Sequence, residues 1–325
     1  MTKISVCVPV YGVEDRIGRC AESLFSQSMT DGVEFIFVDD ASPDGSMAEL
    51  RDVMARLAER LDVKLLRHDK NKGLPEARRT AVLAAKGDFV AHVDSDDFVE
   101  PTYLEALYAE AMSSGADVIF SDMREEYAHG CKVSHSSWAR GFADLGVAAL
   151  LGNDSTYLWG KLIRRELYVR NPDCHAPSCL RVKEDCYSSV RLCHYAKSLA
   201  HAGVCLYHYD RRVPQSLTRA RVDAQFQAML RLWEGMRAFF AAAYPDGRYD
   251  DALESAMVRE KAAMMLFRHD FSAKRKYADV FREEEGRHVS ELHGGLWLML
   301  TLVRHHVWPL VWLYTQYAQW RERRM

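Results

Sequence analysis

The sequence has no Cys-x-x-Cys pair, although it contains eight cysteines in 325 residues. Four of these cysteines fall between Cys174 and Cys193, and their spacings match none of the common zinc-binding patterns. We therefore expect free, reduced thiols, as in a cytoplasmic protein, rather than a zinc site or a disulfide framework.

A strong excess of charge of either sign is also missing, because 43 Lys and Arg residues face 46 Asp and Glu residues. The net charge of −3 gives no general attraction to nucleic acid, and we expect no such partner. The first apolar run, at 4–10, is too short and too weakly flanked by basic residues for a secretion signal. We expect a cytoplasmic protein.

The first 120 residues alternate strand-like and helix-like patterns. This βαβα order predicts an α/β fold with a mostly parallel central sheet covered by helices on both faces. Short helical pieces are expected near 143–151, 160–168 and 183–195, and a strand at 202–209. The expected early strands are 4–10, 33–38, 62–66, 88–93 and 116–120, and the helices between them are 16–27, 47–60, 75–85 and 103–112.

Carboxylates follow two of the expected strands. Asp39 and Asp40 come after one, and Asp94, Asp96 and Asp97 come after another. Carboxyl ends of parallel strands share one edge of the sheet, where ligands bind in open α/β folds. Carboxylate oxygens are the ligands that Mg²⁺ and Mn²⁺ prefer, often together with substrate phosphates. A solvated acidic loop is the alternative.

Six short patterns, taken in order, resemble those of family 2 glycosyltransferases. They cover about residues 4–217, and their agreement in order and spacing makes the resemblance specific. The resemblance implies a GT-A nucleotide-diphospho-sugar transferase fold and an inverting enzyme that uses a nucleotide-sugar. The patterns are Val6-Cys7-Val8-Pro9-Val10-Tyr11, Phe37 to Ser46, Asn71-Lys72-Gly73 with Arg78, Asp94-Ser95-Asp96-Asp97, Trp159-Gly160-Lys161-Leu162 and Glu184-Asp185.

The resemblance assigns donor and metal contacts to most of these positions. Asp96 is expected to bind Mn²⁺ or Mg²⁺ at the donor diphosphate, and Asp97 to support it or contact the donor sugar. UDP is favoured over other nucleotides by the resemblance alone. Contacts to the donor nucleotide are expected from Pro9, Tyr11, Asp39, Asn71, Lys72, Gly73, Arg78, Asp94 and Ser95.

Several of the expected donor contacts can also be explained by the chemistry of their side chains or backbone. Pro9 and Tyr11 can form a flat apolar wall for the base, while Asp39 can accept a hydrogen bond from a base N–H. The start of the helix after Gly73 offers backbone N–H groups to an anion. Asp40 is open between a helix-capping role and a binding role.

Acceptor-side chemistry is expected about ninety residues after the metal motif. Asp185 matches the family's general base and Glu184 its neighbour, although an acidic pair at a helix start is also favoured by the helix dipole. Trp159 and Lys161 resemble an acceptor-binding segment, where the indole either stacks on a sugar or packs in the core. Asp210 stands where the family has Arg, so either Arg211 or Arg212 is expected at the diphosphate.

The sequence predicts a catalytic domain at 1–217, with a nucleotide-binding half at 1–120 and an acceptor-binding half at 121–217, and a helical region at 218–325. Within the helical region, 294–325 carries four of the seven tryptophans, Trp297, Trp308, Trp312 and Trp320, and ends in Arg321, Arg323 and Arg324. Its apolar blocks are too interrupted to span a bilayer. We expect either peripheral membrane contact at the inner face of the cell membrane, or a helical lid or oligomer contact, such as a homodimer, that packs on the catalytic domain.

The favoured function is sugar transfer from a UDP-sugar to a saccharide or lipid-linked saccharide in surface polysaccharide synthesis. A sugar nucleotidyltransferase would need a glycine- and arginine-rich loop after the first strand, and 9–15 does not supply one. A dehydrogenase is disfavoured because no GxGxxG follows that strand. The non-enzymatic alternative is a catalytically silent scaffold that docks a membrane complex. The presence of both Asp96 and Asp185 argues against it.

Overall fold

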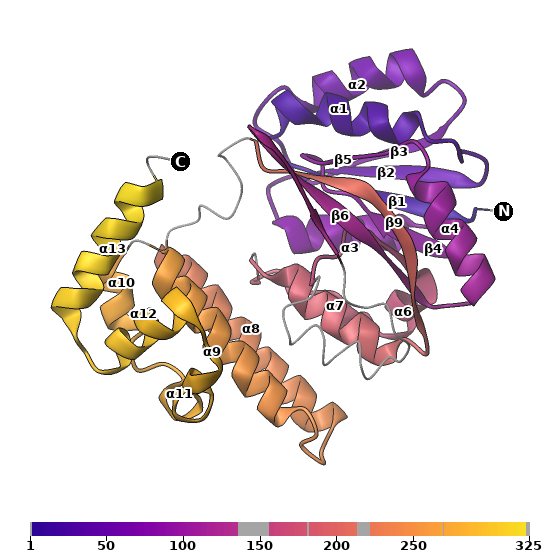
Figure 1. Ribbon diagram of the computed structural model, residues 1–325. Helices are drawn as coiled ribbons and strands as arrows, with labels where there is room; N and C mark the ends of the chain where they lie inside the picture. Colours follow the sequence, from indigo (N-terminus) through magenta and orange to yellow (C-terminus); the bar gives the residue numbers. More distant parts are fainter. Residues whose placement is uncertain (1, 136–155, 181, 213–221, 269, 323–325) are drawn as a thin grey trace. The chain divides into compact units, whose positions relative to one another are not determined.

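The computed structural model describes residues 2–135, 156–180, 182–212, 222–268 and 270–322. These residues divide into two compact units, one ending at residue 212 and one beginning at residue 222. The first unit is α/β and the second is helical (Figure 1). The helix expected near 143–151 and the predicted boundary at 217 lie outside the described residues.

One mixed sheet forms the centre of the first unit. Its strands are β1 (Ile4–Val10), β2 (Val33–Asp39), β3 (Asp62–Arg67), β4 (Phe89–His92), β5 (Phe98–Val99), β6 (Val118–Tyr127), β7 (Gly130–Ser134), β8 (Lys161–Arg164) and β9 (Leu199–Asp210). The order is β3-β2-β1-β4-β8-β6-β9-β5, and β7 pairs with β6. Strands β1 to β4 are parallel neighbours, whereas β8 runs antiparallel between β4 and β6.

Helices cover both faces of this sheet. They are α1 (Glu14–Phe25), α2 (Ser46–Leu57), α3 (Leu74–Ala84), α4 (Tyr103–Ser114), α6 (Arg165–Arg170) and α7 (Glu184–Tyr195), with a 3₁₀ turn η1 (Pro172–Cys174). Every residue of β1 and β2 is buried, as expected for apolar strands between two helical layers. Helix α1 buries Ile17, Cys20 and Leu24 against the sheet, and lies with α2 on the face opposite α3 (Figure 1).

The alternating pattern of the first 120 residues is confirmed, with strand and helix limits shifted by a few residues. The prediction of a helical piece over 160–168 is wrong in its first half. Leu162 and Ile163 form the buried strand β8 there, and α6 begins only at Arg165. A short apolar run does not distinguish a buried strand from a buried helix, and here pairing with β4 and β6 decides.

The carboxyl ends of β1, β2 and β4 meet at one edge of the sheet. Val10, the last residue of β1, is in register with Asp39, the last residue of β2. The backbone N–H of Val93, just past β4, donates to Cys7 of β1. The loops that leave this edge therefore carry Tyr11, Asp40 and the three aspartates after β4.

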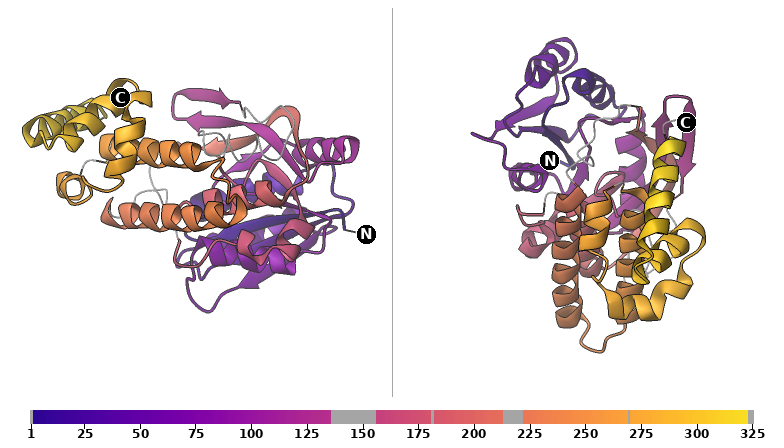
Figure 2. Two further views of the ribbon diagram at one scale, coloured as in Figure 1. Left: turned by 90° about the horizontal axis from the view of Figure 1, so that it is seen from below. Right: turned by 90° about the vertical axis from the view of Figure 1, so that its left-hand side faces the viewer.

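The second unit is a helical bundle whose helices α8 (Val222–Ala243) and α9 (Asp250–Phe267) lie side by side (Figure 2). Helix α8 packs through a stripe of residues three or four apart, and these are all buried: Phe226, Met229, Trp233, Met236 and Phe240. The remaining elements are α10 (Phe271–Lys276), α11 (Arg282–His288), a 3₁₀ turn η3 (Val289–Glu291), α12 (Gly294–Arg304) and α13 (Trp308–Glu322).

Helices α12 and α13 have one buried and one exposed side. Leu300 of α12 packs with Val258 and Ala262 of α9, and Thr315 of α13 accepts a hydrogen bond from the buried Lys274. No described helix combines the length and the apolar character needed to cross a membrane. The side chains of Trp320 and Arg321, and all of Arg323 and Arg324, lie outside the described residues. The exposed side carries Trp297, Leu298, Leu310, Trp312, Leu313 and Tyr317.

Candidate active site

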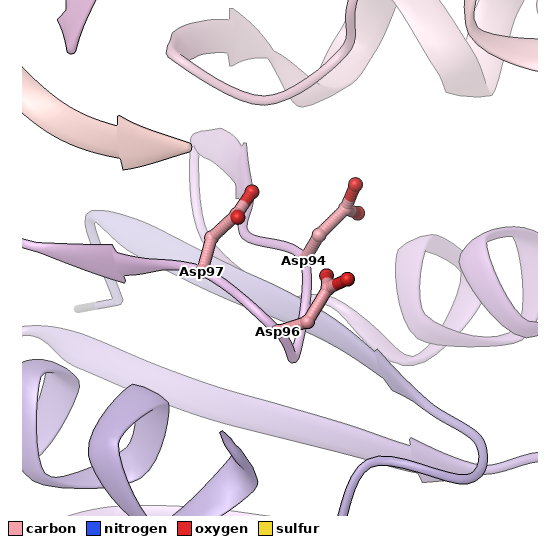
Figure 3. A group of neighbouring side chains, drawn as sticks. All are labelled: Asp94, Asp96 and Asp97. Atoms are coloured by element: carbon pink, nitrogen blue, oxygen red, sulfur yellow. The ribbon is translucent and has the colours of Figure 1, made fainter. Parts of the chain in front are cut away.

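Three aspartates gather in the loop between β4 and β5. One carboxylate oxygen from each of Asp94, Asp96 and Asp97 lies within 4.8 Å of the others, and Figure 3 shows their side chains on the same side of the loop. Among the described residues, this is the one group of three or more acidic, His or Cys side chains so placed. Burial, aided by the charge of Asp94, raises the pKa of Asp96. Crowded oxygen ligands of this kind suit Mg²⁺ or Mn²⁺.

The three aspartates are not equivalent. Asp97 is 1% exposed, and both of its oxygens accept hydrogen bonds, from the Tyr207 hydroxyl at 2.7 Å and the Asp210 N–H at 2.9 Å. Asp97 therefore fastens the loop to β9, and burial places it as a support rather than as a sugar contact. Asp94 and Asp96 keep partly exposed side chains, while Ser95 is buried between them.

Arg78 of α3 connects the aspartate loop to the start of α7. Its Nη2 donates to Asp94 at 2.7 Å and its Nη1 donates to Glu184 at 2.5 Å. The side chain is 6% exposed, so this bridge is protected from water. Charge-assisted hydrogen bonds in such surroundings hold their partners firmly. This bridge is a role of Arg78 that the sequence did not indicate, and its expected contact with the donor nucleotide stays a prediction.

Asp185 lies in the first turn of α7, directly after Glu184, with which the helix begins. The residue before them, Lys183, has a positive φ of 66°, so the chain turns sharply into the helix. Asp185 accepts a hydrogen bond from the Cys186 N–H at 2.7 Å and remains partly exposed. Burial raises the pKa of Asp185 while Arg78 opposes the shift, and burial with the Asp185 charge raises the pKa of Glu184 to about 8. A raised pKa suits a carboxylate that must accept a proton.

The expected base wall and base acceptor lie at the ends of β1 and β2. Pro9 is buried within β1, and Tyr11 just beyond it is 41% exposed. Asp39 is 2% exposed and accepts a hydrogen bond from the Ser42 N–H at 2.7 Å through Oδ1. Its other oxygen lies 3.4 Å from Arg67 Nε. The sheet edge thus places an aromatic ring and a carboxylate at the ends of two adjacent parallel strands.

Asp40 positions the turn that opens α3. Its carboxylate accepts the N–H groups of Lys72 and Gly73, both at 2.8 Å, and lies 2.6 Å from His68 Nδ1. The sequence expectation was that this turn offers free N–H groups to an anion, and these two are already bound within the protein. Asn71 and the exposed Lys72 side chain remain at the same edge. The open choice for Asp40 is decided in favour of a structural role at the turn.

Trp159 lies inside an aromatic stack. Its ring centroid is 4.3 Å from that of Tyr157 and 4.6 Å from that of Tyr207, and only 4% of the residue is exposed. Burial on both ring faces favours the core alternative over a sugar platform. Tyr157 and Tyr209, which the sequence did not single out, are the partly exposed members of this stack.

Lys161 is also buried, with 2% of the residue exposed. Its Nζ donates to the Tyr157 carbonyl and lies 5.1 Å from the centre of the Phe120 ring. Burial lowers the pKa of Lys161 to about 8. Lys161 therefore supports the aromatic stack from within, and the Trp-x-Lys signal reflects packing of β8.

The two candidate arginines after β9 point to different partners. Arg211 donates to Glu125 and lies over the rings of Tyr127 and Tyr209, whereas Arg212 makes two hydrogen bonds to Asp210. Since Asp210 is bonded to Asp97, Arg212 is the arginine next to the aspartate loop.

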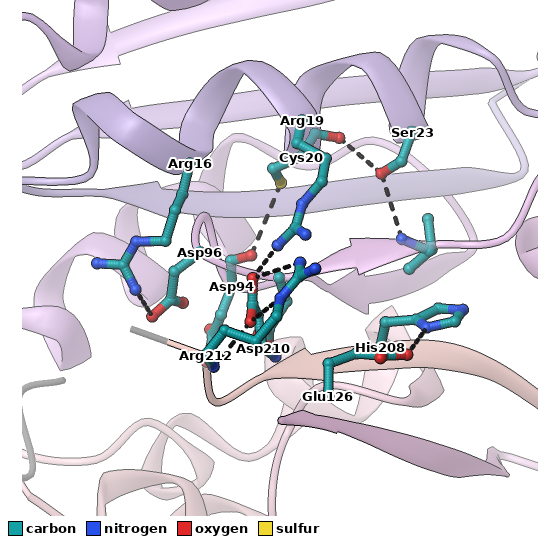
Figure 4. Close-up of polar contacts among 12 residues, drawn as sticks. Arg16, Arg19, Cys20, Ser23, Asp94, Asp96, Glu126, His208, Asp210 and Arg212 are labelled. Carbon is teal, nitrogen blue, oxygen red and sulfur yellow. Dashed lines mark hydrogen bonds and ion pairs between the residues drawn. The ribbon is translucent and has the colours of Figure 1, made fainter. Parts of the chain in front are cut away.

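Helix α1 adds two arginines that sequence reasoning missed. Arg16 donates to Asp96 at 3.1 Å, and Arg19 pairs with Asp210 (Figure 4). Both lie on one face of α1, since they are three residues apart. The sequence around Arg16 and Arg19 does not indicate a function, because arginines are common on the surface of amphipathic helices.

The geometry can be compared with known proteins. A family model described as glycosyl transferase family 2 matches residues 5–185, more than half of the chain. The chain belongs to this family. The predicted family and the GT-A fold are confirmed.

The share of this chain that its relatives match varies widely. The Bacillus subtilis glycosyltransferase EpsH is 29% identical over 289 residues, covering 86% of this chain and 81% of EpsH. The poly(ribitol-phosphate) beta-glucosyltransferase of Bacillus spizizenii is 33% identical over a shorter stretch, 38% of this chain and 19% of the relative. The crystal structure of residues 1–349 of S. aureus TarS with UDP superposes with a TM-score of 0.70 at 20% identity, covering 98% of this chain and 92% of that TarS fragment.

Proposed function

We propose that this family 2 enzyme transfers a sugar from a UDP-sugar to a hydroxyl of a saccharide or lipid-linked saccharide, with inversion at the anomeric carbon, in surface polysaccharide synthesis. The carrying observation is the Arg78 bridge, because one buried guanidinium holds both Asp94 of the aspartate loop and Glu184 beside Asp185. Donor-side and acceptor-side groups of one reaction must lie this close together.

The UDP donor is supported by similarity and by the sheet edge. TarS was crystallised with UDP and with UDP-GlcNAc, and that protein shares the fold of this chain. Asp39 can accept from a uracil N–H, and the exposed Tyr11 ring can cover the base. The polymer-modifying relative, named for poly(ribitol-phosphate), supports an acceptor that belongs to a surface polymer.

Asp96 and Asp94 are the residues that would hold Mn²⁺ or Mg²⁺. Both carboxylates are partly exposed. One oxygen of Asp96 accepts a hydrogen bond from Arg16, and one oxygen of Asp94 accepts a hydrogen bond from Arg78. The second oxygen of each is a hard ligand of the kind these cations take. A bound divalent cation supplies Lewis-acid stabilisation of the charge that develops on the leaving diphosphate.

Asp185 serves as the general base in this proposal. Inversion requires that the acceptor hydroxyl attack the anomeric carbon from the side opposite the leaving diphosphate. As the new C–O bond forms, the hydroxyl proton passes to a carboxylate oxygen of Asp185. Arg78 holds Glu184 and thereby fixes the first turn of α7, from which Asp185 projects.

Donor hydrolysis tests this function without knowledge of the acceptor. We expect slow hydrolysis of one or a few UDP-sugars that depends on Mn²⁺ or Mg²⁺, because water can replace the acceptor hydroxyl. The measurement is release of UDP from a panel of UDP-, GDP- and dTDP-sugars, with and without EDTA. A silent scaffold would release no nucleotide from any donor, and a sugar nucleotidyltransferase would release UTP when pyrophosphate is added.

The exposed side of α12 and α13 is the second part of the proposal. Leu313 and Tyr317 are 54% and 55% exposed and lie one helical turn apart on α13. An open groove of about 420 Å³, lined by Phe271, Arg275, Trp308, Pro309, Trp312 and Leu313, adjoins them. Tryptophans beside basic groups suit the interface of an anionic bilayer. We propose peripheral membrane contact here, with a homodimer contact as the competing outcome.

Substitution of Leu313 and Tyr317 by Ser is expected to reduce binding to vesicles that contain phosphatidylglycerol by about tenfold, because two exposed apolar anchors are lost. Co-sedimentation measures it, and Leu83→Ser, at a 70% exposed position of α3, is the control. Unchanged vesicle binding with a loss of dimer in light scattering would establish the homodimer instead. Deletion of 294–325 is less informative, because Leu300 and Val303 belong to the core of the second unit.

A further inference from the structure

We propose that Arg16 and Arg19 of α1 form a guanidinium pair that binds the diphosphate of the donor, with Arg16 making the principal contact. The inference rests on the proposed function in one respect, namely that the donor is a nucleoside diphosphate sugar. It extends the donor site to a helix that none of the sequence motifs includes.

Arg16 lies beside the proposed metal ligand. Its Nη1 donates to Asp96 Oδ2 at 3.1 Å, and its side chain is only 12% exposed (Figure 4). Asp96 is the proposed metal ligand, and metals of this class bridge protein carboxylates and substrate phosphates. A diphosphate that shares a cation with Asp96 must therefore lie within a few ångströms of the Arg16 guanidinium.

Arg16 has more hydrogen-bond donors than its contact with Asp96 uses. A guanidinium has five N–H donors, and within the described residues the Arg16 side chain donates one hydrogen bond, to Asp96. The remaining donors of the same planar fork are suited to phosphate oxygens, which guanidinium groups bind in pairs. Arg16 can thus keep its bond to Asp96 and contact the diphosphate at once.

Arg19 and Arg212 extend the positive surface from Arg16 toward β9. Arg19 pairs with Asp210 and lies 4.1 Å from the centre of the Phe98 ring, which holds its guanidinium in place. Arg212 reaches the same Asp210 carboxylate with its Nε and Nη2 at 2.9 and 3.0 Å. Arg19 and Arg212 retain exposed fractions of 35% and 42%, so both can also meet a ligand.

The alternative is that Arg16 only neutralises Asp96 in the folded protein. The two roles predict different responses. If Arg16 binds the diphosphate, its removal weakens the binding of UDP and leaves the binding of uridine unchanged. Its removal also deletes a positive charge that competes with a metal ion for Asp96, so Mn²⁺ alone should bind more tightly. If Arg16 only stabilises the fold, its removal would weaken the binding of UDP and of uridine to the same extent.

The test compares the wild-type protein with Arg16→Ala and Arg19→Ala, using Arg51→Ala on the exposed face of α2 as the control. UDP and Mn²⁺ binding are measured by calorimetry, and uridine binding by ligand-observed NMR. We expect Arg16→Ala to lower the affinity for UDP by about ten- to a hundredfold, as for the loss of charge-assisted hydrogen bonds. The affinity for uridine should stay unchanged, and Mn²⁺ alone should bind severalfold more tightly. Arg19→Ala should weaken UDP less, and Arg16→Lys should lie between wild type and Arg16→Ala.

Each other outcome has a definite meaning. Equal UDP affinity in Arg16→Ala and wild type overturns the inference, as does an equal loss of UDP and uridine. Failure of the wild-type protein to prefer UDP over uridine contradicts the proposed function itself, whatever the variants do. If Arg16→Ala does not fold by circular dichroism, Arg16→Gln, which keeps an N–H₂ group but removes the positive charge, provides the same comparison.

Discussion

Asparagine in place of Asp185 is expected to lower kcat for sugar transfer by about a thousandfold or more, while UDP binding stays near the wild-type value. The side chains have the same shape, so the hydrogen bond from the Cys186 N–H is kept. The amide cannot accept the proton of the acceptor hydroxyl, so the chemical step alone is lost. Transfer rates and calorimetric UDP affinity are the two measurements.

A matched control separates catalysis from the helix dipole. Asp251→Asn makes the same exchange in the first turn of α9, where the side chain is 94% exposed, and should leave transfer unchanged. Near-normal turnover of Asp185→Asn would instead show that this acidic pair only stabilises the start of α7.

The pH profile of the wild-type enzyme gives a second check on Asp185. A carboxylate acts as a base only when ionised, so activity is present above its pKa and is lost as pH falls through it. Since burial raises the pKa of Asp185, the acid limb of the kcat profile should lie above the usual aspartate value of 3.8.

Asp96→Asn is expected to remove the response to Mn²⁺ and to lower turnover at least about a hundredfold, because the cation then loses its charged ligand. UDP affinity should no longer rise when Mn²⁺ is added. Asp97→Asn is the instructive contrast: its carboxylate joins Tyr207 and the Asp210 N–H, so it should lower the melting temperature. An Mn²⁺ response that persists in Asp96→Asn would transfer the metal role to Asp94.

Local patterns account for what the sequence could predict of the fold. Strands β1, β2 and β4 are apolar runs between amphipathic segments, so their type and order are readable without tertiary knowledge. The sequence predicts a helix where β8 lies, because the apolar Leu162 and Ile163 suit a buried helix and a buried strand equally. Only pairing with β4 and β6 decides between the two structures. The antiparallel insertion of β8 is a long-range property that no local window contains.

The candidate site was predictable where a motif carried it, and not where contacts came from elsewhere in the chain. Asp94 and Glu184 both belong to motifs of the family resemblance, and both accept hydrogen bonds from the buried Arg78. Trp159 carries an acceptor motif but is buried in an aromatic stack. Arg16 reaches Asp96 from a position 80 residues away in sequence, a contact that spacing cannot indicate.

The central claim is that one site joins a UDP-sugar, a divalent cation and a general base around the Arg78 bridge. A crystal structure of Asp185→Asn with Mn²⁺ and the donor found in the hydrolysis screen tests it most directly, since the variant should bind the donor without consuming it. The account predicts uracil beside Asp39, Mn²⁺ on Asp96 and residue 185 facing the anomeric carbon from the side opposite the diphosphate. Donor bound away from the aspartate loop, or residue 185 turned away from the sugar, would contradict the account.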